Sequence, residues 1–299
     1  MSWWDYGHMI TYISKRIPNA NPFQQGVTGP TGSSSFFIAQ SEDTANAVLD
    51  AAGTRYVVTD IEMDTGKFWA MATWYNATEA AAPYQMTLLT PSQTDSTKYE
   101  SVLLNEQPYY HTTISRLHNF DGSLTPATTT YYIEYADSTI TSISLPVITN
   151  AVAMNASAAS ARAVQYNLNA PLGYHATVLS PSIVNPIDTV PALRHYRLVH
   201  ESPTNVFDSK TTDVKYVKIF EYVKGAHIKG TGIIEVPLVS DTGRNFTYRQ
   251  ESVNGEFVVP YSTTGNPFPV KATGKYHIVG TGTTFDVPES AVVQGTAIN

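Results

Sequence analysis

The chain has 299 residues with 25 acidic and 18 basic side chains, so it carries a net charge of −7 and no clustered basic patch. This balance argues against a nucleic-acid partner, and the lack of cysteine excludes disulfides, thiolate nucleophiles and cysteine-ligated zinc. No signal peptide or apolar run of about 18 residues occurs, so we expect a soluble protein or a soluble part of a longer one.

The chain opens with Trp3-Trp4-Asp5-Tyr6-Gly7, which places two indoles, a carboxylate and a phenol at one turn. An indole N–H only donates hydrogen bonds and an ionised carboxylate only accepts them. Trp3, Trp4 and Asp5 together would therefore suit a ligand hydroxyl. A structural alternative stays open, in which both tryptophans lie in the core and Asp5 caps a helix.

A helix is expected directly after Gly7. Met9, Ile13 and Ile17 follow at four-residue spacing on one face, and Pro18 would stop the helix. Because a functional pentapeptide seldom begins a natural protein, Met1 is interpreted as an added residue.

The next elements indicate a mixed α/β unit. A helix is predicted from Glu42 to Ala52, with Ser41 as its N-cap and Gly53 as its end. Residues 55–59 are rich in β-branched side chains and predict a strand.

A second helix is predicted from about Glu62 or Asp64 to Trp74, with a kink or irregular turn near Gly66. Asp64, Lys67 and Met71 would lie along one side of it. On their own, these three residues are better explained as a surface ion pair followed by a core methionine.

The amino-acid composition changes at about residue 123, after which Thr, Ser, Ala and Tyr dominate. Residues 124–191 predict a β-rich insertion, residues 193–223 predict two strands or a helix and a strand that return to the first unit, and the segment from Gly225 predicts a β-sandwich. Four lysines with strand-like spacing are expected on a solvated strand face: Lys215, Lys218, Lys224 and Lys229.

The expected fold class is therefore α+β. It comprises a central mixed α/β domain (residues 1–123 and 192–223), the insertion (124–191) and a β-sandwich-like peripheral domain (224–299). Sequons begin at Asn76, Asn155 and Asn245, and they weakly favour an extracytoplasmic face. The eight histidines show no spacing typical of metal ligands.

Two motifs resemble one enzyme family. The run from Trp3 to Gly7 matches the signature pentapeptide of oligosaccharyltransferase catalytic subunits. Asp64-Thr-Gly-Lys67-Phe-Trp-Ala-Met71 fits the Asp-x-x-Lys-x-x-x-Met/Ile motif of archaeal and eukaryotic members, in the same order. Later segments are also similar to archaeal members: 197–202, 218–222 and 241–248. The resemblance is strongest over 1–75 and 193–250, and the insertion is unmatched.

The resemblance implies a transferase that moves a lipid-linked oligosaccharide onto Asn of Asn-x-Thr/Ser in an acceptor protein or peptide. Trp3, Trp4 and Asp5 would bind the Thr/Ser hydroxyl, and Met71 would touch the Thr methyl. The remaining motif residues would support them: Lys67 and Asp64 by lining or bracing the pocket, Tyr6 and Gly7 by shaping the turn.

The resemblance also implies what the chain lacks. In the family, the catalytic acids and the divalent metal (Mn or Mg) belong to membrane-embedded loops that precede the pentapeptide. The lipid-linked oligosaccharide is bound by that membrane part as well. We therefore expect no catalytic residue, metal site or cofactor here, and no transfer by the isolated chain. The expected location is the extracytoplasmic face of the cell membrane.

Two alternatives remain. A non-enzymatic cell-surface or carbohydrate-binding β module would explain residues 124–299 but leaves both motifs unaccounted for. A complete soluble glycosidase would rest only on generic acidic residues.

Overall fold

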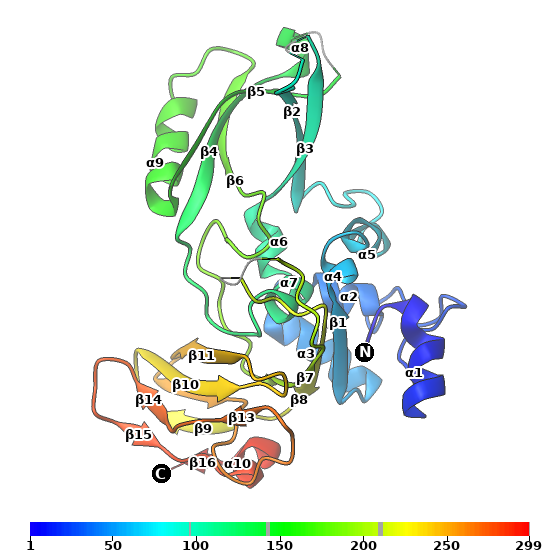
Figure 1. Cartoon of the computed structure of the whole chain (residues 1–299), viewed down its shortest axis with the longest axis vertical. Helices are drawn as coiled ribbons and strands as arrows, with labels where there is room; N and C mark the ends of the chain where they lie inside the picture. Colours follow the sequence, from blue (N-terminus) through cyan, green and yellow to red (C-terminus); the bar gives the residue numbers. More distant parts are fainter. Residues whose placement is uncertain (96, 142–143, 209–211, 299) are drawn as a thin grey trace. The chain divides into compact units, whose positions relative to one another are not determined.

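The computed structural model describes residues 1–95, 97–141, 144–208 and 212–298. It divides into two compact units, and Figure 1 traces the chain through both. Unit 1 comprises Met1–Ala80, His111–Thr125 and Pro191–Asn299, and unit 2 comprises Ala81–Tyr110 and Pro126–Val190. Helices and several sheets coexist in the chain, which confirms the α+β class.

Unit 1 contains a three-stranded antiparallel sheet built from distant parts of the sequence. β1 (Tyr56–Asp60) pairs with β8 (Val217–Tyr222), and β8 pairs with β7 (Tyr196–Glu201). The predicted return of residues 193–223 to the first unit is therefore confirmed, as a pair of strands. Val57 and Phe220 are fully buried and anchor the sheet in the core.

Short helices of unit 1 precede these strands or lie between them in the chain. They are η1 (Trp4–Tyr6), α1 (Gly7–Ser14), α2 (Ser33–Ile38), α3 (Glu42–Ala52), α4 (Ile61–Asp64), α5 (Phe68–Tyr75) and α7 (Thr113–His118). The prediction for α3 is confirmed, because Gly53 ends the helix in the left-handed conformation (φ 61°) that glycine tolerates. Ser41 occupies the N-cap position, although its side chain makes no capping bond.

The prediction for the first helix was wrong at its C-terminus. α1 ends at Ser14 because Lys15 adopts a left-handed conformation (φ 56°). The three apolar residues with four-residue spacing are open to solvent, since Met9, Ile13 and Ile17 are 58%, 72% and 98% exposed. Asp5 does not cap this helix, which makes no side-chain N-cap bond.

Residues 225–298 of unit 1 form two further sheets, in line with the expected β-sandwich-like region. One has the order β11-β10-β14-β15 with β13 beside β10, and the other has the order β12-β9-β16. Their bounds are β9 (Ala226–Lys229), β10 (Ile233–Val239), β11 (Asn245–Glu251), β12 (Glu256–Val259), β13 (Lys271–Ala272), β14 (Tyr276–Ile278), β15 (Thr284–Phe285) and β16 (Ala297–Ile298), with α10 at Glu289–Gln294. Burial alternates along β10, so one face of its sheet is covered.

Unit 2 is a five-stranded sheet of order β3-β2-β5-β4-β6. Its elements are β2 (Gln85–Pro91), β3 (Tyr99–Asn105), β4 (Thr129–Ala136), α8 (Ser138–Thr141), β5 (Val147–Asn155), α9 (Ala156–Asn167) and β6 (Tyr174–Leu179), while α6 (Gln107–His111) lies where the chain passes into unit 1. Tyr132 packs with Ala159 and Ala163 of α9, and the adjacent Ile133 packs with Leu88 in a second cluster. Successive residues of a strand point to opposite faces, so both faces carry a core.

Two features of the domain organisation differ from what the sequence pattern indicates. Residues 81–110 belong with the insertion in unit 2, because β2 pairs with β5 and β3. The insertion also carries a 12-residue helix, α9, beside its strands. The boundary between a central and a peripheral domain within unit 1 stays a prediction.

The expectation of a solvated lysine face was wrong for two of the four lysines. Lys218 is buried and ion-paired with Asp121 at 2.7 Å, and Lys215 is buried beside Asp213. A lysine that alternates with apolar residues looks solvent-facing in sequence, but a buried acidic partner allows it to point inward. Lys224 and Lys229 are exposed as expected.

Candidate functional site

The fold brings the two sequence motifs into direct contact. The Lys67 Nζ donates to Asp5 Oδ2 at 2.5 Å and to the Tyr6 hydroxyl at 2.7 Å, and it lies 4.2 Å from the centre of the Tyr6 ring. Asp5 and Lys67 each keep about 30% of their side-chain surface exposed, at 31% and 30%. We call Asp5, Tyr6 and Lys67 the motif cluster.

The first motif is held as a tight helical turn. The backbone N–H of Tyr6 donates to the carbonyl of Trp3 at 3.2 Å, which closes η1 and leads into α1. Gly7 is required there because a Cβ would lie 2.6 Å from the Ala20 carbonyl oxygen and 2.8 Å from the Asn21 Cα.

Gly7→Ala is therefore expected to destabilise the chain by roughly 1–3 kcal/mol, because the obstacle is backbone that cannot rotate away. The gain in helix propensity, about 1 kcal/mol, acts in the opposite direction. Urea unfolding would measure the change. Gly282→Ala is the matched control, since a Cβ there meets open space. Equal unfolding midpoints for the two variants would contradict the packing argument.

The second motif lies across a helix break. The structure confirms the predicted irregular turn: α4 ends at Asp64, α5 begins at Phe68, and the N–H of Lys67 donates to the Glu62 carbonyl at 2.7 Å. Asp64, Lys67 and Met71 therefore do not share the face of one helix, contrary to the expectation. The break places Lys67 at the N-cap position of α5, from which its ammonium reaches Asp5.

Several predicted site residues are buried. Asp64 has no exposed surface and accepts a hydrogen bond from Asn119 Nδ2 at 2.9 Å, at the C-terminal end of α7. Met71 is fully buried and Trp3 is 2% exposed, while Trp4 is half-buried with its ring centre 6.5 Å from that of Trp3. An approaching ligand would therefore first contact the partly exposed residues, which are Trp4, Asp5 and Lys67.

One oxygen of the Asp5 carboxylate has an unusual environment. Oδ2 accepts from Lys67, but Oδ1 is buried and has no hydrogen-bond partner among the residues that the structure describes. A buried acceptor without a partner costs about 1–3 kcal/mol of desolvation. A hydroxyl donor brought by a ligand would remove that cost.

The Tyr6 phenol remains neutral in this cluster. Burial, a hydrogen bond with Asp60 and the negative charges of Asp60 and Asp5 raise the pKa of Tyr6 well above its ordinary value. Asp60 also caps α4, accepting from the Met63 N–H at 2.8 Å. The sequence reasoning missed both Asp60 and Asn119. The position of Asp60, at the end of a β-branched strand and before an apolar turn, could have predicted a helix cap. No sequence pattern pointed to Asn119.

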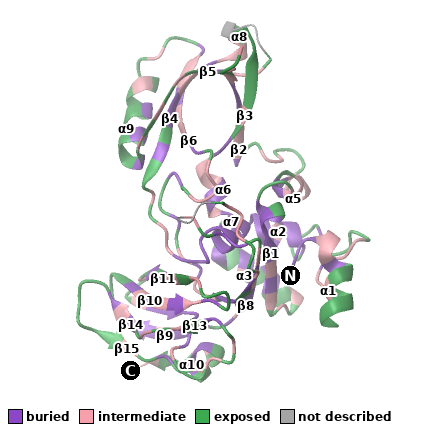
Figure 2. Cartoon of the chain, in the orientation of Figure 1, coloured by how far each residue is buried: buried purple, intermediate pink, exposed green. Residues whose placement is uncertain are grey.

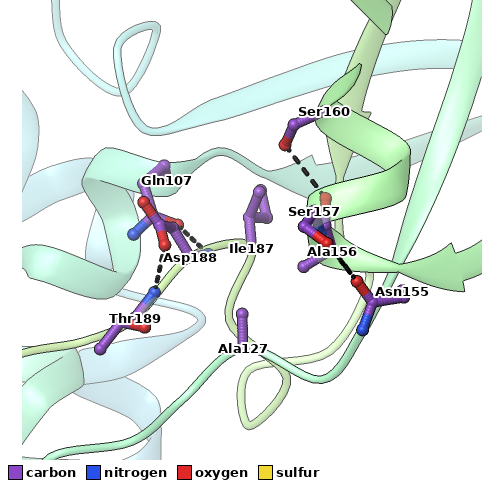
Figure 3. Close-up of a pocket in the computed structure, with 9 residues that line it drawn as sticks. All are labelled: Gln107, Ala127, Asn155, Ala156, Ser157, Ser160, Ile187, Asp188 and Thr189. Atoms are coloured by element: carbon purple, nitrogen blue, oxygen red, sulfur yellow. Dashed lines mark hydrogen bonds between the residues drawn. The ribbon is translucent and has the colours of Figure 1, made fainter. Parts of the chain in front are cut away.

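Two pockets lie away from the motif cluster. In unit 2, a pocket of about 530 Å³ opens at the start of α9, lined by Gln107, Ala127, Asn155, Ala156, Ser157, Ser160, Ile187, Asp188 and Thr189 (Figure 3). Asn155, the first residue of a sequon, caps α9 there. In unit 1, a pocket of about 600 Å³ contains the Arg55–Glu221 ion pair and Lys224. Neither pocket includes a predicted site residue.

The described residues do not fit a resident metal, because they contain no group of three or more His, Asp or Glu side chains placed to hold one. Within the same residues, no helix combines the length and apolar character needed to cross a membrane.

Two protein-family models match this chain, one near each end. The AglB core domain family matches residues 1–64, and the archaeal glycosylation protein B long peripheral domain matches residues 225–298. Dolichyl-phosphooligosaccharide-protein glycotransferase 3 of Archaeoglobus fulgidus is 32% identical over 93% of this chain and 34% of its own length. The glycotransferase AglB of Haloferax volcanii is 30% identical over 89% of this chain and 29% of its own length.

A solved oligosaccharyltransferase from Archaeoglobus fulgidus has the same fold. Its structure tethered by a disulfide to an acceptor peptide with the NVT sequon is 28% identical, with a TM-score of 0.62, over 99% of this chain and 37% of that one. The same protein was crystallised with zinc and sulfate. This chain spans about a third of the length of the curated relatives. Two AglB domain models match the chain, a relative aligns with most of it, and a solved oligosaccharyltransferase has the same fold. The chain therefore belongs to the AglB family of archaeal oligosaccharyltransferases.

Proposed function

We propose that this chain is the acceptor-recognition part of a membrane oligosaccharyltransferase, and that it binds the Thr or Ser hydroxyl of Asn-x-Thr/Ser sequons. The observation that carries the proposal is the Asp5 carboxylate, anchored through Oδ2 by Lys67 while Oδ1 lacks a partner among the described residues. A hydroxyl that donates to Oδ1 would complete the site. The match of the AglB core domain to residues 1–64 supports this reading over a carbohydrate-binding β module.

The other motif residues would act around this bond. The indole N–H groups of Trp3 and Trp4 would donate to the lone pairs of the hydroxyl. Trp3 and Met71 are covered in this fold, so binding would have to uncover them. Asp64, held by Asn119, would brace the helix break that presents Lys67.

These roles predict a ranked selectivity. A peptide with alanine in place of Thr or Ser leaves the Asp5 acceptor unmatched, and sites built for a hydroxyl reject such analogues strongly. Contact between Met71 and the Thr methyl would add about 0.8 kcal/mol, or roughly a fourfold preference for Thr over Ser.

The whole protein would transfer a lipid-linked oligosaccharide to the sequon Asn of an acceptor protein, on the extracytoplasmic face of the cell membrane. We infer that the divalent metal, Mn or Mg, would be held outside this chain, because the described residues supply no suitable ligands. The isolated chain should therefore bind acceptor peptide weakly and catalyse no transfer.

Disulfide capture tests this proposal. The chain contains no cysteine, so Thr65→Cys creates a single thiol in the exposed linker between Asp64 and Lys67. Cysteinyl peptides carrying Asn-x-Thr, Asn-x-Ser or Asn-x-Ala would be equilibrated with it in a redox buffer. We expect capture in the order Thr, Ser, Ala. Equal capture of all three peptides would refute hydroxyl recognition by this chain.

A further inference from the structure

An apolar face of α1 lies open beside the motif cluster. Met9, Tyr12 and Ile13 lie at i, i+3 and i+4 on the helix and are 58%, 77% and 72% exposed, and Ile17 just beyond it is 98% exposed. Phe23 extends the patch, because its exposed ring packs edge-on against His8 at 5.4 Å between ring centres. We call these five apolar side chains the α1 patch; Figure 2 shows this helix exposed along most of its length.

The polar groups of α1 do not compete for this face. Thr11 Oγ1 donates to the Gly7 carbonyl at 3.0 Å and Ser14 Oγ donates to the Ile10 carbonyl at 2.6 Å, so both hydroxyls are satisfied within the helix. Grouped apolar side chains of this kind are uncommon on a free surface and mark a site of association.

Two cations identify the partner. Lys15 and Arg16 stand between Ile13 and Ile17, are exposed, and form no ion pair with any residue in the described part of the chain. The chain as a whole is acidic, so this pair is a local exception. Lys15 Nζ lies 4.8 Å from the centre of the Tyr12 ring, which places positive charge at the edge of the apolar face. Basic residues next to apolar and aromatic ones are typical of helices that lie in the interface of an anionic membrane.

We propose that the α1 patch, with Lys15 and Arg16, docks onto the surface of a bilayer that contains anionic lipid headgroups. The apolar side chains would enter the boundary between headgroups and acyl chains, and the two cations would contact lipid phosphates. Since Tyr6 directly precedes α1, docking would hold the motif cluster at the membrane surface. This inference goes beyond acceptor recognition and does not depend on it.

Vesicle flotation with the full 299-residue chain tests the proposal. Vesicles of phosphatidylcholine alone would be compared with vesicles that also contain phosphatidylglycerol, at low and high salt. We expect binding to the anionic vesicles that weakens with salt. Ile13→Asp/Ile17→Asp should abolish it, and Lys15→Gln/Arg16→Gln should lower the partition coefficient roughly 30-fold.

The controls place equivalent changes elsewhere. Leu172→Asp changes a side chain that is 96% exposed in unit 2, and Lys229→Gln/Lys271→Gln removes two exposed cations. Both should bind vesicles like the unmodified chain, and matching thermal unfolding would show that every variant is folded. No binding to anionic vesicles, or binding that the α1 variants leave unchanged, would overturn the proposal. The proposal would also be overturned if the chain binds no vesicles but forms a dimer in sedimentation equilibrium that Ile13→Asp dissociates. The α1 patch would then bind a second copy of the chain.

Discussion

Asp5→Ala is expected to abolish the difference in capture between Asn-x-Thr and Asn-x-Ala peptides. The variant removes the only proposed acceptor for the hydroxyl proton, and a hydrogen bond to a charged group contributes about 1.5–3 kcal/mol, or roughly 10- to 150-fold in affinity. Capture of the Asn-x-Thr peptide by the Thr65→Cys chain should therefore fall to the level of the Asn-x-Ala peptide. Retained selectivity would show that Asp5 does not read the hydroxyl.

This loss should occur without loss of the fold. The Asp5–Lys67 ion pair is about one-third exposed on both sides, and such pairs contribute at most about 1 kcal/mol to stability. Asp95→Ala is a control that removes a more exposed aspartate, also paired with a lysine. Lys67→Met should weaken selectivity in part, and the double variant Asp5→Ala/Lys67→Met should be no worse than Asp5→Ala alone, because Lys67 would act through Asp5.

Asp121→Ala is expected to be the most damaging of these changes for stability, costing about 3–5 kcal/mol of the free energy of unfolding. Asp121 accepts from Lys218 Nζ at 2.7 Å and from Arg244 Nη1 at 2.7 Å, and those two side chains are 1% and 9% exposed. Removing the carboxylate leaves two buried cations, of which only Arg244 keeps a carboxylate partner, Glu201 at 2.6 Å.

Urea unfolding at neutral pH would measure that cost. Asp286→Ala is the matched control, because its ion pair with Lys275 is exposed on both sides (53% and 57%) and should contribute less than about 1 kcal/mol. A similar unfolding midpoint for Asp121→Ala and Asp286→Ala would show that the buried network contributes no more than a surface pair.

The same network predicts how stability depends on pH. Burial alone would raise the pKa of Asp121, but the charges of Lys218 and Arg244 outweigh burial and hold it well below the ordinary value. A carboxyl whose pKa is lower in the folded state stabilises fully above its unfolded pKa, about 3.9, and loses this contribution as the pH falls toward its folded pKa. Unfolding midpoints measured down the acid range should therefore fall less steeply for Asp121→Ala than for the unmodified chain. Parallel slopes would contradict this assignment.

Local sequence signals were reliable where one residue type decides the backbone. Gly53 ends α3 because glycine accepts a positive φ, and the weak helix propensity of Gly66 correctly predicted a break within the second motif. Helix spacing misled at two places. The spacing of Met9, Ile13 and Ile17 extended the first helix beyond its end at Ser14, and Met71 lies on a different helix from Asp64.

By itself, the sequence determined the mixed α+β class and both motifs with their order, because periodicity, turn residues and rare residue types are properties of neighbouring positions. Only the tertiary structure decided that Lys67 meets Asp5 and Tyr6, that Asn119 holds Asp64, that residues 81–110 pair with the insertion, and that Lys218 points inward to Asp121. These contacts join residues tens of positions apart. Their partners are selected by strand pairing and by the burial of charge against charge, which no local pattern encodes.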